Sequence, residues 1–415
     1  MSKKYVVVVG DGMADWPLDE LNGKTPLQVA ETENMDFIAK NGRTGLLKTI
    51  PNGFTPGSDV ANLSLLGYDP KLYYPGGRGP LEALANDIKL MEGDIAFRAN
   101  LITVKDNKIL DYSAGHISTE EARELIKSLN ESLSLENVEF YSGISYRNLL
   151  ILRNKSKDFS SELECKPPHD IVGEAIEKNL IKPKHKAAEK TAKLLNELML
   201  NSRKILERHE INIKRLQQGK RPANMIWLWG QGMLKKLPSF EERFKLKGSI
   251  ISGVDLIKGI GKLLGLEVIK VEGATGYLDT NYKGKAVAAI KSLKDRDFVY
   301  IHIEAPDEAS HQGLLEEKIK AIERIDKLIV GKILDANIEN LVISIATDHA
   351  TPLKLRTHIS APVPFAVFDQ DTKNKDSVES YDEISAAKGS FGTLLGYKLM
   401  EILFNSKIQK NNYGR

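Results

Sequence analysis

The chain has 415 residues, of which 41% are hydrophobic and 28% charged, and its formal net charge is +3. This composition is ordinary for a globular protein with one large domain carrying an insertion, or with two to three domains. The small net charge does not favour nucleic acid or membrane as a partner, and the single cysteine, Cys165, excludes an intramolecular disulfide or a cysteine-based zinc cluster. With no apolar stretch of membrane-spanning length and no signal-peptide pattern, we expect a soluble, cytoplasmic protein.

Short apolar runs that end in polar residues recur along the chain. The first, at residues 5–9, is mostly β-branched and is followed by GDG, as in a strand buried on both faces of a parallel sheet. Helical patterns such as 315–334 alternate with comparable runs at 44–50, 225–229, 249–253, 267–271, 298–303, 341–346 and 364–368. The alternation predicts an α/β fold with a mostly parallel sheet and helices on both faces.

The region from 88 to 180 has a different pattern. Residues 96–113 predict a hairpin that turns at Asp106-Asn107, and Ser118 with Glu121 predicts the start of a helix. Strand pairs with one helix favour a smaller α+β domain over 88–180, inserted into a core domain of 1–87 and 181–415. A long basic helix at about 185–216 is expected to return the chain to the core domain.

Four polar clusters follow predicted strands. They contain Asp11, then Ser58, then Asp307 with His311, and finally Asp348, His349 and His358. Ligands of open parallel sheets bind beyond the carboxyl ends of the strands, where these clusters would meet. Carboxylate and imidazole groups without thiolates suit Mn²⁺, Zn²⁺, Co²⁺ or Mg²⁺, and this number of groups is about what two metal ions need.

Each cluster also has a simpler structural interpretation. Asp11 could form an ordinary Asp-Gly turn, and Ser58 could cap the helix that follows it. The pair of Asp348 and His349 after a strand could likewise be only a turn or a cap. Asp307 and His311, four residues apart, could be a salt bridge on one face of a helix. The metal hypothesis depends on the position of all four clusters at predicted strand ends.

The order of the motifs resembles that of the archaeal-type 2,3-bisphosphoglycerate-independent phosphoglycerate mutases, in the alkaline phosphatase superfamily. The matching segments are VVVVGDGMAD, TPGSDVANLSLLGYDP, GRGPLEA, FRANLITV, AGHIS, IKGIGKLLG, VEGATGYLDT, PDEASH, and TDHATP followed by His358. The resemblance covers nearly the whole chain and implies an alkaline-phosphatase-like core. It also implies an isomerase of glycolysis and gluconeogenesis that interconverts 3-phosphoglycerate and 2-phosphoglycerate. Such an enzyme works through a phosphoserine intermediate with two divalent metal ions, here Mn²⁺ by preference, and without bisphosphoglycerate.

The resemblance assigns the site residues to two metal ions. One ion would be bound by Asp11, Ser58, Asp348 and His349, and the other by Asp307, His311 and His358. Ser58 would be the nucleophile that carries the phosphoryl group. A metal ion would favour its alkoxide, and the start of a helix adds donors for an oxyanion.

A mutase must also hold the glycerate and exclude water. Arg98 and Arg147 in the inserted domain are candidates, because a guanidinium binds carboxylate or phosphate bidentately. We expect Lys258 near the phosphate, and His169 with Asp170 could relay a proton between the glycerate hydroxyls. The alternatives are solvated strand residues for the arginines and a capped loop for the pair.

Other functions remain open on the sequence alone. A metal-dependent phosphatase or another phosphomutase of the superfamily would share the core residues. A non-catalytic scaffold would lack at least one of them, and a dinucleotide-binding protein would have G-x-G-x-x-G where this chain has GDGMAD. We assign His302 to the structure or the surface, although its position in the alternating run at 298–303 could also turn it toward the site. We expect a small-molecule substrate, and the sequence indicates no oligomeric state.

Overall fold

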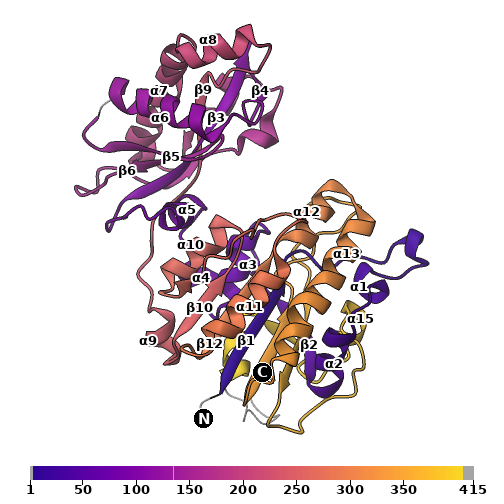
Figure 1. Cartoon of the computed structure of the whole chain (residues 1–415). Coiled ribbons are helices and arrows are strands. Elements are labelled where there is room, and N and C mark those ends of the chain that lie inside the picture. The colour runs from indigo at the N-terminus through magenta and orange to yellow at the C-terminus, as the bar shows by residue number, and fades with distance from the viewer. Residues whose placement is uncertain (1–2, 134, 405–415) are drawn as a thin grey trace. The chain divides into compact units, whose positions relative to one another are not determined.

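The computed structural model of the chain describes residues 3–133 and 135–404. The chain divides into two compact units, which we call unit 1 (Met1–Tyr74 with Leu237–Arg415) and unit 2 (Pro75–Lys236). Figure 1 shows the elements of each unit along the chain.

Unit 1 is built on an eight-stranded sheet with the order β11-β10-β12-β1-β13-β14-β2-β15. Its strands are β1 (Lys4–Gly10), β2 (Arg43–Lys48), β10 (Gly248–Ile251), β11 (Glu267–Val268), β12 (Phe298–Ile303), β13 (Leu341–Ala346), β14 (Val363–Asp369) and β15 (Thr393–Leu395). The strands from β11 to β13 are parallel, and β14 runs antiparallel to both of its neighbours. The predicted α/β fold with a mostly parallel sheet is confirmed.

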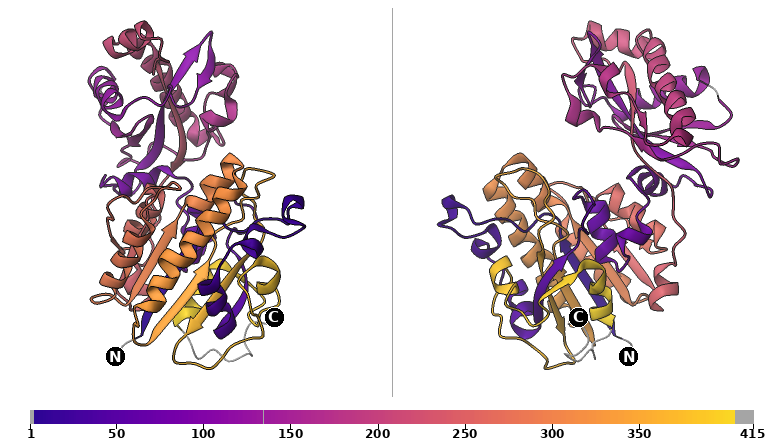
Figure 2. Two further views of the ribbon diagram at one scale, coloured as in Figure 1. Left: turned by 45° about the vertical axis from the view of Figure 1, so that its right-hand side comes forward. Right: turned by 180° about the vertical axis from the view of Figure 1, so that it is seen from behind.

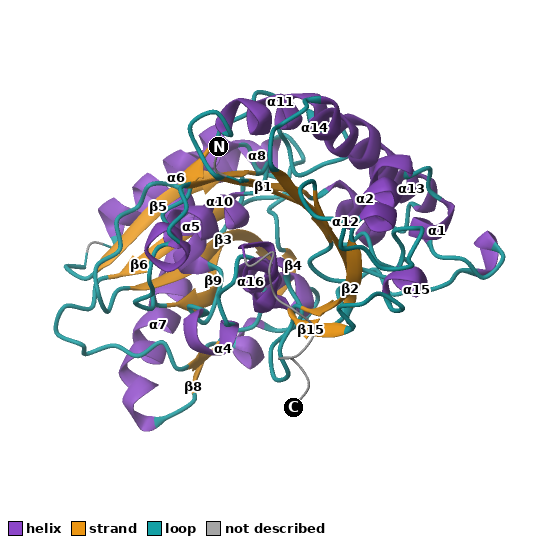
Figure 3. Cartoon of the chain, turned by 90° about the horizontal axis from the view of Figure 1, so that it is seen from below, coloured by secondary structure: helices purple, strands orange, loops and turns teal. Residues whose placement is uncertain are grey.

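Helices cover both faces of this sheet, as the view along it shows (Figure 3). Val6 and Val8 of β1 pack in one hydrophobic core with α2, α11 and α13, and the helices coloured orange run along that face (Figure 2). On the opposite face the ring of Tyr5 meets Phe404 of α16 with centroids 4.9 Å apart.

None of the described helices combines the length and the apolar character needed to cross a membrane. The α-helices of unit 1 are α1 (Pro26–Val29), α2 (Glu33–Asn41), α3 (Ser58–Leu65), α4 (Pro70–Tyr73), α9 (Phe240–Phe244), α10 (Asp255–Leu263), α11 (Tyr282–Ser292), α12 (Ala305–Gln312), α13 (Leu315–Ile325), α14 (Gly331–Asp335), α15 (Glu383–Ala386) and α16 (Leu399–Phe404).

Unit 2 holds a five-stranded sheet, in which β4, β3, β6 and β5 follow one another and β9 also pairs with β3. The predicted hairpin turns at Asp106 and Asn107, whose positive φ angles of 49° and 58° suit a two-residue turn. The predicted helix start is also present, since the Ser118 side chain accepts a hydrogen bond from the Glu121 amide. The strands and α-helices of unit 2 are β3 (Ile95–Lys105), β4 (Lys108–Asp111), β5 (Val138–Ile144), β6 (Arg147–Leu152), β7 (Leu163–Glu164), β8 (Lys182–Pro183), β9 (Met225–Gly232), α5 (Gly79–Ala85), α6 (Thr119–Ser132), α7 (Glu189–Leu206) and α8 (Glu210–Gln217).

The division between the units differs from the boundaries at 88 and 180 that we took from the sequence. Unit 2 spans Pro75–Lys236, and β9 is antiparallel to β3 inside it rather than a strand of the parallel sheet. The physical reason is burial, because Leu195 and Met199 of α7 share a core with Trp227 of β9. The amphipathic pattern of this helix predicts that one face is buried, but does not say which sheet buries it.

A buried ion pair joins α13 to the loop after β1. Lys318 is fully buried, and its Nζ donates to Asp15 Oδ2 over 2.7 Å and to the Thr351 carbonyl over 3.1 Å. The Asp15 carboxylate also accepts from the Leu353 amide over 3.1 Å. Burial lowers the pKa of Lys318, and the neighbouring Asp15 charge opposes that shift. The pair therefore ties together the two loops that follow β1 and β13.

We expect Lys318→Met to destabilise the protein by about 3–5 kcal/mol, because it leaves Asp15 buried without its cation. Lys320→Met is the matched control, since Lys320 lies on the same helix, is 48% exposed and pairs with Glu317 at the surface. The control should change the free energy of unfolding by less than about 1 kcal/mol. Urea unfolding followed by circular dichroism compares the two, and equal losses would contradict a special role for the buried pair.

Candidate active site

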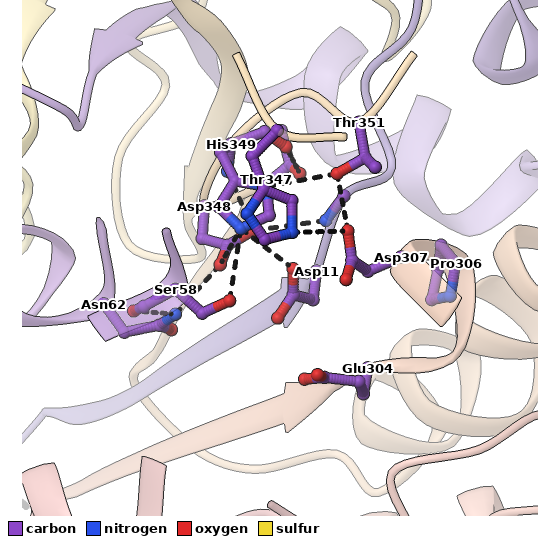
Figure 4. Close-up of polar contacts among 12 residues, drawn as sticks. Asp11, Ser58, Asn62, Glu304, Pro306, Asp307, Thr347, Asp348, His349 and Thr351 are labelled. Carbon is purple, nitrogen blue, oxygen red and sulfur yellow. Dashed lines mark hydrogen bonds and ion pairs between the residues drawn. The ribbon is translucent and has the colours of Figure 1, made fainter. Parts of the chain in front are cut away.

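Three neighbouring parallel strands bring the predicted clusters together. Asp11 directly follows β1, Asp307 lies in the first turn of α12 after β12, and Asp348 follows β13. β1 pairs with β12 on one side and with β13 on the other, so all three carboxylates reach the same edge of the sheet (Figure 4). The fourth cluster comes from α3, of which Ser58 is the first residue.

The first set of residues surrounds one imidazole nitrogen. His349 Nε2 lies 3.1 Å from Ser58 Oγ, 3.4 Å from Asp348 Oδ2 and 3.5 Å from Asp11 Oδ1. Asp11 Oδ1 is buried and accepts no hydrogen bond from the described residues. Nor does Ser58 act as a cap, because the residue at the N-cap is Gly57 and no side chain caps this helix. Four oxygen and nitrogen donors thus face one another in a buried site, as the ligands of a cation do.

The second set lies beside the first. His311 Nε2 is 3.1 Å from Asp307 Oδ2, and His358 Nε2 is 3.4 Å from Asp307 Oδ1. The two imidazole nitrogens are 2.9 Å apart. The ring of His358 stacks on that of His349 with centroids 4.0 Å apart, so the two sets are neighbours. The structure therefore brings together all seven residues that the sequence singled out for two metal ions.

The buried carboxylates and imidazoles of the site shift one another's pKa values. Burial, and next the Asp348 charge, raise the pKa of Asp11 well above its usual range. Burial would also raise the pKa of Asp307, but hydrogen bonds from His311 and His358 hold it well below its usual range. The same hydrogen bond raises the pKa of His311 to about 9. A divalent cation in each set would balance the carboxylate charges that bound protons balance here.

Asn62 links the nucleophile helix to the strand ends. Its Nδ2 donates to Asp348 Oδ2 and to the Ser58 carbonyl, each over 2.9 Å. Its Oδ1 accepts from the fully buried Tyr300 hydroxyl over 2.6 Å. The Asp348 carboxylate is also fixed by the Gly12 amide, which donates to Oδ1 over 3.2 Å. These hydrogen bonds orient Asp348 relative to Ser58, as the partners of a ligand do in metal sites.

Two residues of this cluster were missed from the sequence. His302, which we assigned to the structure or the surface, is fully buried with Nε2 2.9 Å from Asp11 Oδ2. Burial lowers the pKa of His302 to about 4, so the ring is neutral near pH 7. Glu304 lies two residues further along the chain, and burial raises the pKa of its carboxyl to about 8. The signal was the strand pairing, because His302 is in register with Val9, two residues before Asp11.

Unit 2 gathers its candidate residues around an indole ring. Arg98 is 9% exposed and is therefore not a solvated strand residue. Its Cζ lies 4.7 Å from the Trp229 ring centroid, and its Nε is 3.0 Å from Glu82 Oε2. The ring of His169 meets Trp229 with centroids 5.4 Å apart. Burial lowers the pKa of Arg98, and the nearby charge of Arg147 contributes to that shift. Arg98 and His169 thus lie against the same indole ring, whereas Arg147, the first residue of β6, is exposed.

The remaining candidates are more exposed. The side chains of His169 and Asp170 are 46% and 63% exposed, with His169 Nε2 3.6 Å from Asp170 Oδ1. Lys258 lies in α10 beyond the carboxyl end of β10 and donates to Asp255 Oδ1 over 3.1 Å. Its charge contributes to lowering the pKa of Lys285, which burial brings to about 8.

Comparison with known proteins gives the family. A family model described as 2,3-bisphosphoglycerate-independent phosphoglycerate mutase matches residues 39–212. A protein with that name from Methanosarcina barkeri is 50% identical over 407 residues, covering 97% of this chain and 100% of the relative. A probable enzyme of that name from Geobacter sulfurreducens is 48% identical over 409 residues, covering 97% and 100%.

Two solved structures agree with the fold. A cofactor-independent phosphoglycerate mutase from Thermoplasma acidophilum is 31% identical, with a TM-score of 0.69 over 97% of this chain and 99% of that one. A Pyrococcus horikoshii protein is 30% identical, with a TM-score of 0.83 over 99% and 100%.

The metal-free protein should lose stability as pH rises from about 6.5 to about 9. The folded pKa of His311, about 9, lies above the unfolded value of about 6.5, so its proton stabilises the folded state fully below pH 6.5. That contribution is lost as pH rises through the folded pKa. We expect His311→Asn to flatten the slope, measured as urea midpoints of the chelator-treated protein across this range. An equally steep slope in the variant would contradict the assignment to His311.

Proposed function

The chain belongs to the 2,3-bisphosphoglycerate-independent phosphoglycerate mutase family, and we propose that it interconverts 3-phosphoglycerate and 2-phosphoglycerate through a phosphorylated Ser58. The family resemblance of the sequence is thereby confirmed. Members of this family are isomerases. The observation that carries the proposal is the place of Ser58 Oγ, 3.1 Å from His349 Nε2 at the start of α3 and next to the buried Asp11 and Asp348.

We propose that the two sets each bind one divalent metal ion. The fit rests on the donors themselves, which are carboxylates, imidazoles and one hydroxyl with no thiolate. The unpartnered Asp11 Oδ1 and the His311 and His358 nitrogens 2.9 Å apart are both arrangements that a cation relieves. Mn²⁺ is the ion we favour, with Zn²⁺, Co²⁺ and Mg²⁺ as alternatives. Bound ions would acidify the Ser58 hydroxyl and stabilise charge on the transferred phosphoryl group.

The residues of the chain then account for the transfer. Ser58 Oγ forms a bond to phosphorus as the bond to one glycerate oxygen breaks, and the second half of the reaction reverses this at the other hydroxyl. The amide groups at the start of α3 offer donors to the phosphoryl oxygens. Asn62 keeps Asp348 oriented toward this helix. Lys258, beyond the end of β10, would add positive charge for the phosphate.

We propose that unit 2 supplies the groups that hold the glycerate. Arg98 and Arg147 would bind its carboxylate or phosphate, and the stacking of Arg98 on Trp229 would fix the plane of its guanidinium. His169 and Asp170 would move a proton between the two hydroxyls. A phosphatase needs none of these groups, because water accepts its phosphoryl group. The small-molecule substrate is therefore a phosphoglycerate.

Ser58→Ala should remove turnover. In a coupled assay, metal-stripped protein would receive Mn²⁺, 3-phosphoglycerate and enolase without bisphosphoglycerate, and phosphoenolpyruvate would be followed. We expect a loss on the order of 10⁴-fold or more, since a lost nucleophile is not replaced. Ser64→Ala is the matched control, because Ser64 lies on the same helix and its Oγ has no hydrogen-bond partner among the described residues.

Two outcomes of this assay would change the proposal. Free phosphate in place of phosphoenolpyruvate would retain Ser58 and the metal ions but make the protein a phosphatase. Unaltered turnover by Ser58→Ala would exclude the phosphoserine step.

Arg98→Lys should lower kcat/KM for 3-phosphoglycerate by about 10- to 100-fold, because an ammonium cannot replace a planar, bidentate guanidinium. Arg123→Lys, at an exposed position of α6, is the control and should change little. Steady-state kinetics in the coupled assay measure both. Normal kcat/KM in Arg98→Lys would exclude Arg98 as a substrate ligand.

A further inference from the structure

One buried hydroxyl touches both sets of residues. Thr351 lies in the loop after β13, two residues beyond His349, and is fully buried. Its Oγ1 is 2.5 Å from Asp307 Oδ1 and 3.2 Å from His349 Nδ1 (Figure 4). Asp307 belongs to one set and His349 to the other, so Thr351 connects the two.

The proton count at Thr351 fixes the direction of these hydrogen bonds. An ionised carboxylate can only accept, so the one hydroxyl proton of Thr351 goes to Asp307. The hydroxyl can then only accept from His349, which places a proton on Nδ1 of that ring. In a neutral imidazole the other nitrogen carries the lone pair. His349 Nε2, which faces Ser58, Asp11 and Asp348, is therefore the free nitrogen.

The backbone holds Thr351 in place from both sides. Its amide donates to the Ala14 carbonyl over 3.2 Å, and its carbonyl accepts from Lys318 Nζ over 3.1 Å. The loop after β1 also leaves room for the hydroxyl. At Gly12, where φ is +63°, an added Cβ would lie 2.6 Å from Asp307 Oδ1 and 2.7 Å from Thr351 Oγ1. A side chain at Gly12 would thus collide with the contact between Thr351 and Asp307.

We infer that Thr351 is a positioning residue that fixes the tautomer of His349 and joins the two metal-binding sets through one hydroxyl. The inference rests on the proposed metal centre, but adds a residue outside the seven ligands. Metal-ligating histidines depend on the hydrogen bond made by their other nitrogen, because it sets the tautomer and the orientation of the ring. In this chain the acceptor of the hydrogen bond from His349 is the Thr351 hydroxyl, which itself donates to Asp307, a residue of the second set.

The test uses two substitutions in the full chain. Thr351→Val has nearly the same shape but no hydroxyl, whereas Thr351→Ser keeps the hydroxyl and loses a methyl group. The metal-stripped proteins would first be compared by ¹⁵N NMR of the histidine side chains at mildly alkaline pH. The His349 signals would be assigned by their loss in His349→Gln. Mn²⁺ binding would then be measured by titration calorimetry without substrate.

We expect the unsubstituted protein and Thr351→Ser to carry the His349 proton on Nδ1 and to bind Mn²⁺ similarly. Thr351→Val should lose this tautomer preference and bind Mn²⁺ about 10- to 100-fold more weakly. Circular dichroism melting checks that the variants are folded. Equal effects of both substitutions would show that Thr351 only fills space and would overturn the inference. An unchanged tautomer in Thr351→Val would also overturn it.

The two measurements separate this inference from the proposed function. If the unsubstituted protein binds no Mn²⁺, the proposed metal centre fails, while the tautomer still decides whether Thr351 orients His349. If Mn²⁺ binds normally and the tautomer does not depend on Thr351, the metal centre stands and the inference fails.

Discussion

The parallel pairing of β1 with both β12 and β13 is the contact on which the site depends. Gly10 is in register with Ile303, and Val9 with Ala346, so the three strands end at nearly the same level. A parallel sheet delivers all its carboxyl ends to one edge, whereas an antiparallel neighbour would send every second strand end to the other side. The fold thereby gathers three aspartates that are far apart in the sequence. Its cost is the burial of three carboxylates in one place.

Several buried contacts offset that cost. Asp11, Asp348 and Asp307 are 0%, 0% and 4% exposed, and ionised groups at such positions need partners. Imidazoles surround Asp307, Asn62 and Gly12 donate to Asp348, and His302 lies against Asp11. A buried Lys318 holds the loops that carry these groups. Such a site is prepared for cations, because its geometry is fixed by contacts that do not involve them.

Much of this arrangement could be predicted from the sequence. Apolar runs followed by Asp11, Asp307 and Asp348 predicted both the sheet and the edge where the site lies. His302 was missed, because a histidine inside an apolar strand is interpreted as a core residue unless the register of the neighbouring strand is known. Thr351 gave no signal, because a threonine near a histidine is common, and only the distance to Asp307 distinguishes it. The boundaries of unit 2 were set too narrowly, since β9 pairs with β3 from more than a hundred residues away.

The pairing of β9 with β3 has a consequence for the way unit 1 folds. Unit 2 begins at Pro75 and ends at Lys236, and near these points the Met233 amide donates to the Pro75 carbonyl over 3.0 Å. Once unit 2 has formed, its entry and exit are adjacent. For unit 1, the segment between Tyr74 and Leu237 then costs about as much loop-closure entropy as a short connection. Strands β1 and β2 can therefore meet β10 to β15 without the entropic penalty that an open chain of that length would impose.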